Sequence, residues 1–343
     1  MFLTPWYPSE KDAMSGLFVQ KHVEAVRAQG AEVRVVFSQG WSDTWRQWKA
    51  LQREGWMPDV VQLNVIQKQG LLALWLKKRY GIPYAIIEHW TGYLPENMSV
   101  KPHSWHTRLM RYICREAEMV MPVSEALGQA MRALGFEAKR WEKIDNVVDD
   151  FFFEKPARIK KNAQCKTLLN ITCFDEPHKN VKSLLRAVKA LSAKRMDWRL
   201  VLVGTGVDFE EVRTFAASLN IAEGLLVWAG EQTPEEVAEW LHQSDAFVLS
   251  SRYETYGVVF AEAVAAGVPI LSTPVGIAEE VADLIVPQEI VQNDPGRFAE
   301  YIERILWNTD RGTGRCPVSD TKRFRAQTIG KHLKAIYEQV RTC

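Results

Sequence analysis

The sequence has few cysteines, no long apolar run and no excess of charge of either sign. Its five cysteines are widely spaced, odd in number and never arranged as Cys-x-x-Cys, which argues against both a disulfide framework and a zinc site. No apolar stretch approaches the roughly 20 residues needed to span a bilayer, and no charged-then-apolar signal pattern opens the chain. We therefore expect a cytoplasmic protein.

The balance of positive and negative charges argues against a nucleic-acid-binding protein. The 343 residues include 43 Lys and Arg against 42 Asp and Glu, and 47% of all residues are hydrophobic. Such a composition is typical of a folded globular protein. The near-neutral net charge lacks the excess of Lys and Arg that binding to nucleic acid requires. Because one hydrophobic core usually stops growing at this length, we expect about two domains.

Strand and helix patterns alternate along the chain in two series. The first covers residues 2–134 and the second residues 167–272, with a lysine-rich segment of little periodicity, residues 151–164, between them. This alternation predicts two doubly wound parallel α/β domains, which bind ligands at the carboxyl ends of their strands. We expect an N-terminal domain at residues 1–150, a second domain at residues 151–320 and a C-terminal helix at residues 321–343.

The most specific segment is residues 250–269. A strand ends at Leu249, a loop carries Glu254, and a helix starts near Gly257, where unpaired backbone amides and the helix dipole favour an anion such as phosphate. Glu262 lies in that otherwise apolar helix, and a buried charge there needs a partner. A phosphate between two carboxylates that accept hydrogen bonds from hydroxyls predicts a nucleotide-sugar site. The alternative is that both glutamates are solvated surface charges.

This segment resembles the signature of the retaining glycosyltransferases of family 4, which have the GT-B fold. That signature has two glutamates separated by seven residues, a central glycine and an Ala-rich helix ending in Gly-x-Pro, as in Glu254, Gly257, Glu262 and the run Gly267-Val268-Pro269. The resemblance implies two Rossmann-like domains that face a central cleft, with the C-terminal helix crossing back to the N-terminal domain. It extends over nearly the whole chain.

The resemblance also implies roles for individual residues. Gly16 would bring the first loop close to the donor diphosphate, and His89, after the strand that ends in Glu88, would meet the transferred sugar. Glu254 would bind the hydroxyls of the donor sugar, and Glu262 would bind the ribose. The remaining donor contacts would come from Thr255, Tyr256, Gly257 and Val258, and the base loop from Gly230, Glu231 and Gln232.

One loop departs from the family pattern. Members usually carry an Arg and a Lys on the diphosphate, in the loop after the first strand of the second domain. Lys179 matches the lysine, but Cys173 or Phe174 stands where the arginine is expected, and neither can supply a fixed charge. Arg252 or His178 is a candidate to compensate.

The resemblance implies transfer of a glycosyl unit from a UDP- or GDP-sugar to a glycan or lipid-linked acceptor, with retention at the anomeric carbon. His89, Glu254 and Lys179 would be the catalytic residues, and polysaccharide or glycoconjugate synthesis the biological role. We expect neither a cofactor nor a metal ion, because no Asp-x-Asp set stands beside a strand end. Two alternatives stay open: a sugar-nucleotide epimerase, and a catalytically weak member of the fold that binds nucleotide sugar or a partner.

Tryptophan is the residue in excess, and nine of the 13 precede residue 150. Trp41, Trp45 and Trp48 follow a helical spacing and could pack on the first sheet. They could instead form a contact surface for an acceptor or a membrane. An acid-free run would extend that surface: Lys101, His103, Trp105, His106, Arg108, Arg111 and Arg115.

Overall fold

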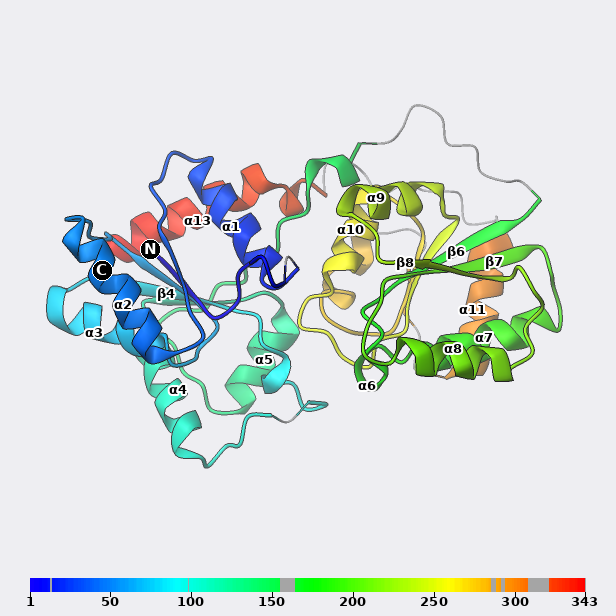
Figure 1. Ribbon diagram of the computed structural model, residues 1–343, viewed down its shortest axis with the longest axis horizontal. Coiled ribbons are helices and arrows are strands. Elements are labelled where there is room, and N and C mark those ends of the chain that lie inside the picture. The colour runs from blue at the N-terminus through cyan, green and yellow to red at the C-terminus, as the bar shows by residue number, and fades with distance from the viewer. Residues whose placement is uncertain are drawn as a thin grey trace. The chain divides into compact units, whose positions relative to one another are not determined.

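The protein is described by a computed structural model over residues 1–12, 14–97, 99–154, 164–284, 288–290, 294–307 and 321–342. It divides into two compact units (Figure 1). Unit 1 comprises Met1–Val147 and Arg323–Cys343, and unit 2 comprises Val148–Lys322. Most of the predicted linker, residues 151–164, lies outside the described residues.

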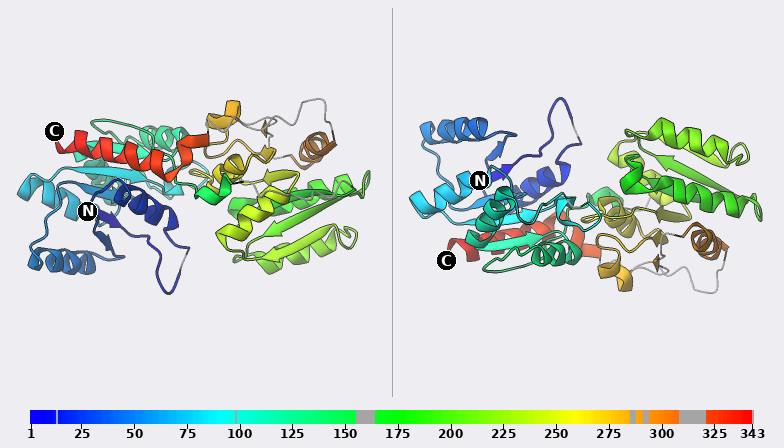
Figure 2. Two further views of the ribbon diagram at one scale, coloured as in Figure 1. Left: turned by 90° about the horizontal axis from the view of Figure 1, so that it is seen from above. Right: turned by 90° about the horizontal axis from the view of Figure 1, so that it is seen from below.

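Unit 1 is a five-stranded parallel sheet with the order β2-β1-β3-β4-β5, flanked by helices on both faces (Figure 2). Strands β1, β3, β4 and β5 are fully buried, as expected for a parallel sheet covered on both sides, whereas the edge strand β2 is partly buried. The elements in chain order are β1 (Phe2–Thr4), α1 (Leu17–Arg27), β2 (Val35–Phe37), α2 (Trp41–Arg53), β3 (Val61–Asn64), α3 (Gly70–Tyr80), β4 (Tyr84–Glu88), η1 (Thr91–Tyr93), α4 (Trp105–Glu116), β5 (Met119–Pro122) and α5 (Glu125–Ala133).

The last helix, α13 (Ala326–Arg341), packs against α1 of the same unit (Figure 1). Its buried stripe is formed by Ile329, Leu333, Ile336 and Val340, the i, i+4, i+7, i+11 spacing of one helix face. Just before α13, both the Nε and an Nη of Arg323 donate to the carboxylate of Asp145, at 2.8 and 3.0 Å. The end of the chain is thereby fixed to unit 1 through both apolar packing and a bidentate ion pair.

Unit 2 is a parallel sheet with the order β11-β10-β9-β6-β7-β8, and with unit 1 it confirms the predicted class of two doubly wound α/β domains. Its elements are η2 (Asp150–Phe152), β6 (Lys166–Ile171), α6 (Glu176–Lys179), α7 (Val181–Ser192), β7 (Trp198–Val203), α8 (Phe209–Ser218), β8 (Leu226–Gly230), α9 (Pro234–Gln243), β9 (Ala246–Leu249), α10 (Val258–Ala266), β10 (Ile270–Ser272), η3 (Glu279–Leu284), β11 (Gln288–Ile290) and α11 (Pro295–Trp307). The short helix η4 (Lys322–Phe324) crosses the boundary between the two units.

Alternate strand residues form the core beneath α7, α8 and α11. Leu200 and Leu202 of β7, like Ala246 and Val248 of β9, point to this side, because successive side chains of a strand alternate between faces. This burial holds the ends of β6 and β9 in fixed register.

The tryptophan stripe of α2 divides between core and surface. Trp48 is completely buried, whereas Trp45 is half-buried and Trp41 is 41% exposed. The Trp45 ring stacks on Trp41 at 5.9 Å and meets the edge of Trp75 from α3 at 4.9 Å. Core packing thus accounts for one end of the stripe only.

None of the helices in the described ranges is both long and apolar enough to cross a membrane.

Candidate functional site: a buried ion pair in unit 2 and a buried histidine in unit 1

The order of strands in unit 2 marks where a ligand is expected. β6 is the first strand of the unit, and its neighbours on the two sides are β7 and β9, so the connections from the centre run in opposite directions. Ligands of doubly wound sheets bind at such a switch point, outside the carboxyl ends of the strands. The loops that leave β6 and β9 at that edge carry Lys179 and Glu254.

Lys179 and Glu254 form a buried ion pair at this edge. The Lys179 Nζ donates to Glu254 Oε1 at 2.6 Å, and the Ser251 Oγ donates to the same oxygen at 2.8 Å. The second oxygen, Oε2, lies 3.5 Å from the Nε2 of His178. The structure therefore brings together two residues that the sequence predicts in one site, across 75 positions of the chain.

The pKa values of the pair are displaced in opposite directions. Burial alone would raise the pKa of Glu254, but the charge of Lys179 and the neighbouring His178 outweigh it and lower that pKa to about 2. For Lys179, burial works to lower the pKa, and the carboxylate of Glu254 overcomes it and raises the pKa above its ordinary value. Both side chains are therefore charged at neutral pH.

The helix α10 begins beside this pair. Gly257 precedes its first residue, Val258, with φ of 80°, and no side chain caps the first turn. The Phe260 amide donates to the Gly257 oxygen at 2.9 Å, so the amides of Val258 and Val259 are the ones that an anion could approach. Tyr256 is buried and Thr255 half-buried. Glu262 follows inside the helix and is only 8% exposed, as its apolar neighbours predict.

A second loop lies directly against the segment that carries Glu254. A Cβ atom at Gly276 would stand 2.2 Å from the backbone oxygen of Tyr256 and 3.2 Å from the Cβ of Glu254. The amide of the next residue, Ile277, donates to that same Tyr256 oxygen at 3.1 Å. Only glycine fits this approach, so the loop after β10 fixes the loop after β9.

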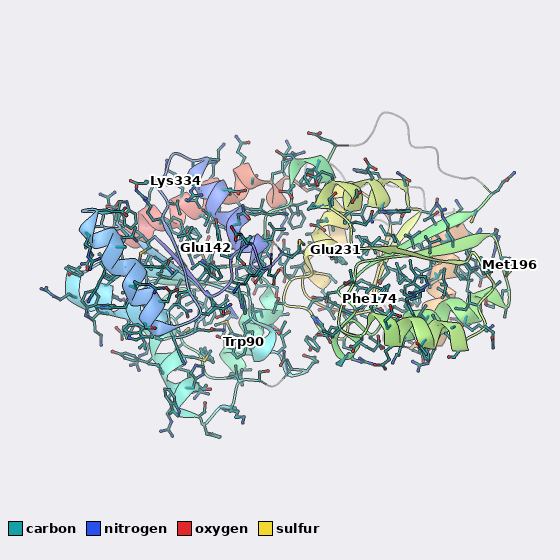
Figure 3. The ribbon with its side chains drawn as sticks, in the orientation of Figure 1. Trp90, Glu142, Phe174, Met196, Glu231 and Lys334 are labelled. Atoms are coloured by element: carbon teal, nitrogen blue, oxygen red, sulfur yellow. The ribbon has the colours of Figure 1, made fainter. Side chains whose placement is uncertain are left out.

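The predicted base loop begins at Gly230, the last residue of β8. Gly230 has a φ of 69°, and Glu231 is exposed (Figure 3). The side chain of Gln232 is held from two sides: its Nε2 donates to the Ala229 oxygen at 3.0 Å, and its Oε1 accepts from the Trp240 Nε1 at 3.2 Å. The side chain of Gln232 thus orders the loop itself.

The loop after β6 has no arginine at the expected position. Cys173 is exposed there. Phe174, labelled in Figure 3, is completely buried with φ of 42°. Its ring packs edge-on against that of Phe209. Arg252, one candidate to compensate, directs both terminal nitrogens to backbone and amide oxygens of residues 176, 177 and 180. Lys179 is therefore the cation that faces Glu254 from this loop.

Gly16 lies in unit 1, immediately before α1. Its φ is 69°, and a Cβ atom there would stand 2.3 Å from the backbone carbon of Trp6 and 2.5 Å from the amide nitrogen of Tyr7. The first loop thus passes close to the start of α1, at the carboxyl end of β1. Glycine is required for both the conformation and the approach.

Gly16→Ala is expected to lower the free energy of unfolding of unit 1 by about 3 kcal/mol, from a strained φ and a backbone clash. Gly40, which precedes α2, provides a matched control, since its φ is −145° and a Cβ atom there would have no other atom within 4 Å. Gly40→Ala should change stability by less than about 1 kcal/mol. Urea denaturation compares the two, and equal losses would contradict the assignment.

His89 directly follows the carboxyl end of β4 and is buried. Its ring is 4.3 Å from that of Phe18 and 5.9 Å from that of His22, and its Nε2 has no hydrogen-bond partner among the described residues. Burial and then the neighbouring His22 lower the pKa of His89 well below its ordinary value. At neutral pH the ring is uncharged and can bond a hydroxyl group.

Glu88, for which the sequence pattern indicates no role, holds the backbone around His89. Its Oε1 accepts from the amides of His89 and Trp90 at 2.9 and 3.0 Å, and its Oε2 accepts from the amide of Ile66 at 3.0 Å. Burial raises the pKa of Glu88, and these donors partly offset that effect. Only the folded chain shows this role, because the donors come from separate segments.

The structure therefore groups the predicted residues by unit. Lys179, Glu254, Thr255, Tyr256, Gly257, Val258, Glu262 and the base loop Gly230, Glu231 and Gln232 lie in unit 2, whereas Gly16 and His89 lie in unit 1. Among the described residues, no three His, Cys, Asp or Glu side chains are grouped so that they could hold a metal ion.

Two family models match the chain, one in each unit. The model described as "Glycosyl transferase 4-like domain" matches residues 23–146, and the one described as "Glycosyl transferases group 1" matches residues 165–308. Together with the solved structures of similar fold, these matches support a glycosyltransferase with the GT-B fold.

Similar proteins agree with this class. The N-acetyl-alpha-D-glucosaminyl L-malate synthase of Bacillus anthracis is 30% identical over 198 residues, 56% of this chain and 49% of that protein. The alpha-monoglucosyldiacylglycerol synthase of Streptococcus pneumoniae is 23% identical over 232 residues, 62% of this chain and 52% of that protein. The chain thus spans about half the length of these relatives.

Two solved structures share the fold over almost the whole chain. The sucrose-phosphate synthase from Thermosynechococcus elongatus superposes with a TM-score of 0.76 at 18% identity, covering 99% of this chain and 98% of its own. Anabaena Alr3699/HepE in complex with UDP and glucose gives a TM-score of 0.75 at 17% identity, covering 98% of both chains. The GT-B prediction is confirmed as a fold.

Proposed function

We propose that the chain transfers a glycosyl unit from a nucleoside diphosphate sugar, with retention of the anomeric configuration and without a metal ion. The observation that carries this proposal is the buried pair of Lys179 and Glu254 beside the uncapped start of α10. The cation of Lys179 and the amides at the start of α10 would bind a diphosphate, and the charged carboxylate of Glu254 would accept hydrogen bonds from sugar hydroxyls.

The residues of unit 2 would act mainly on the leaving group. As the bond between the anomeric carbon and the diphosphate oxygen breaks, negative charge grows on that oxygen, and Lys179 with the amides of α10 would stabilise it. Glu254 would accept hydrogen bonds from the donor sugar, and Glu262 from the ribose. The acceptor hydroxyl would attack on the side from which the diphosphate leaves, and its proton would pass to a leaving-group oxygen.

His89 would bind a hydroxyl of the transferred sugar through its Nε2. His89 suits this role because its ring is neutral and that nitrogen has no partner among the described residues. Gly16 would bring backbone close to the diphosphate. We assign the residues of the base loop, Gly230, Glu231 and Gln232, to the nucleoside.

The acceptor would be a glycan or a lipid-linked glycan in the synthesis of a polysaccharide or glycoconjugate. The names of similar proteins support this class, among them the alpha-monoglucosyldiacylglycerol synthase of Streptococcus pneumoniae and the lipopolysaccharide 1,6-galactosyltransferase of Escherichia coli. The donor would be a UDP- or GDP-sugar, and the complexes of Anabaena Alr3699/HepE with UDP and UDP-glucose favour UDP.

We propose further that unit 1 binds membranes peripherally through the neighbouring helices α3 and α4. Trp105 opens α4 with 72% of its surface exposed, and Arg108 and Arg115 are exposed on the same helix. Lys78 and Arg79 are exposed on α3, which contains no acidic residue. Exposed cations and an exposed tryptophan on two neighbouring helices fit an anionic lipid surface.

Arg108→Ala and Arg115→Ala are each expected to weaken binding to phosphatidylglycerol vesicles about fivefold at low salt. This is the usual contribution of one cationic side chain to binding at an anionic membrane surface. Arg213→Ala provides the control, since this side chain is half exposed in unit 2. Co-sedimentation measures all three. Absence of binding by the wild-type protein, or equal losses for all three variants, would contradict the membrane surface.

A two-step experiment tests the transfer activity. Thermal shift with UDP, GDP and ADP shows which diphosphate the folded chain binds, since a ligand bound only by the native state raises the melting temperature. Incubation with the matching nucleotide sugars, with and without a glycan acceptor, then identifies the product. Conversion of the donor to another nucleotide sugar without acceptor would indicate an epimerase instead.

The exposed Cys173, in place of an arginine, favours one second candidate: a protein that binds nucleotide sugar and turns it over weakly or not at all. Binding of UDP or GDP with neither transfer nor hydrolysis would support this candidate. Transfer with retained configuration would exclude it.

A further inference from the structure

The short helix α6, which ends in Lys179, depends on a neighbouring segment for its hydrogen bonds. A helix leaves its last four carbonyl groups without partners inside the helix. Because α6 has only four residues, this applies to all of its carbonyl groups. In α6 the carbonyl oxygens of all four residues, Glu176 to Lys179, accept hydrogen bonds from residues 250–252. That segment follows β9 and leads directly to Glu254.

Arg252 supplies most of these bonds. Its Nη1 donates to the oxygens of Glu176 and Pro177 at 2.8 and 3.0 Å, its Nη2 donates to Asn180 Oδ1 at 2.8 Å, and its amide donates to the oxygen of His178 at 2.8 Å. A guanidinium fits this task because it is planar, carries several fixed donors and stays charged. A cation is also favourable at the carboxyl end of a helix.

Two further contacts support the same arrangement. The Ser250 Oγ donates to the oxygen of Lys179 at 3.0 Å, and the ring of His178 stacks on that of Tyr253 at 4.3 Å with an angle of 8°. Every contact joins the turn that carries Lys179 to the segment that carries Glu254. Arg252 is the one charged side chain among the described residues that bonds several carbonyls of α6 at once.

We infer that Arg252 is a positioning residue of the donor site: by capping α6 it holds Lys179 against Glu254 and toward the start of α10. Its terminal nitrogens are directed at α6, so Lys179 rather than Arg252 contacts the diphosphate. The part of this inference that concerns the diphosphate rests on the proposed function, whereas the placement of Lys179 does not.

The first test needs no ligand. The side chain of Lys179 is only 15% exposed in its ion pair, so reductive methylation of its amine should be slow in the wild-type protein. In Arg252→Ala and Arg252→Gln, local opening of α6 should accelerate that reaction about tenfold, measured by mass spectrometry. Arg186→Ala is the control, since Arg186 is exposed on α7 and contacts Phe215 rather than α6. Unchanged labelling of Lys179 would overturn the inference.

The second test measures UDP binding by calorimetry in a double-mutant cycle. Arg252→Ala should weaken UDP binding about tenfold in the wild-type background and less than about twofold in the Lys179→Ala background, because its effect passes through Lys179. Equal losses in both backgrounds would show direct contact with the ligand and overturn the positioning role. If the wild-type protein binds none of UDP, GDP and ADP, the proposed function fails, and the labelling experiment alone decides the role of Arg252.

Discussion

Lys179→Ala should lower both sugar transfer and donor hydrolysis by about 100-fold or more, the usual loss for a group that stabilises charge on a leaving group. The expected effect is large because the usual arginine partner is missing: Cys173 stands in its place, and Arg252 is bound to α6. Initial rates at saturating acceptor, measured over a range of donor concentrations, give kcat and KM separately. The larger part of the loss should appear in kcat, and KM for the donor should also rise because Lys179 would contact the diphosphate.

Lys194→Ala is the matched control for this variant. Lys194 lies in the same unit, is 60% exposed and pairs with Glu303 on the surface. Its replacement should leave kcat within about twofold of the wild-type value, since exposed ion pairs contribute little. Wild-type rates for Lys179→Ala would remove Lys179 from the site.

Glu254→Gln is expected to reduce transfer by a similar factor and also to destabilise unit 2. The amide keeps the shape of the side chain, but it leaves the buried amine of Lys179 without its counter-charge. Loss of one partner of a buried pair costs about 3–5 kcal/mol. Glu210→Gln, on an 80% exposed side chain of α8, should change neither property. Thermal denaturation and initial rates measure both, and full activity with an unchanged melting temperature would contradict the role of Glu254.

The same carboxylate predicts how stability depends on pH. The pKa of Glu254 is about 2 in the folded chain against an ordinary value of 4.5, so the folded state favours the charged form. This contribution to stability is fully present above about pH 4.5 and is lost as the pH falls toward about 2. Glu254→Gln should therefore lose less stability than the wild-type protein between pH 5 and about 3, as measured by urea denaturation.

The sequence predicted the segment around Glu254 best, because strand, loop and helix follow one another directly there. The helix after Glu254 begins at Val258 and ends before Gly267, one residue from where the sequence placed its start. The signals there are local: a glycine at each end and an apolar run between them. The resemblance assigned Glu254 and Lys179 to one site, but their ion pair was not predicted, because it depends on the order of the strands in the sheet.

Other features could not be predicted because their causes lie far along the chain. The turn of α6 carries a proline and a histidine and is too short for a periodic pattern, and it is held by residues more than 70 positions away. The sequence therefore predicted a loop there, and it indicated phosphate rather than carbonyl groups as the partner of Arg252. Likewise, spacing alone could not show which tryptophans of α2 are buried and which are exposed, since the burial of Trp48 depends on tertiary packing.

The packing of α13 on α1 has a consequence for synthesis on the ribosome. Unit 1 contains both the first 147 residues and those after Lys322, so all of unit 2 is made before unit 1 has its last helix. Until then the apolar face of α1 that α13 covers has no partner from its own chain. Domains usually fold in the order of their synthesis. Here unit 2 can be fully synthesised and folded before α13, which completes unit 1, has been synthesised.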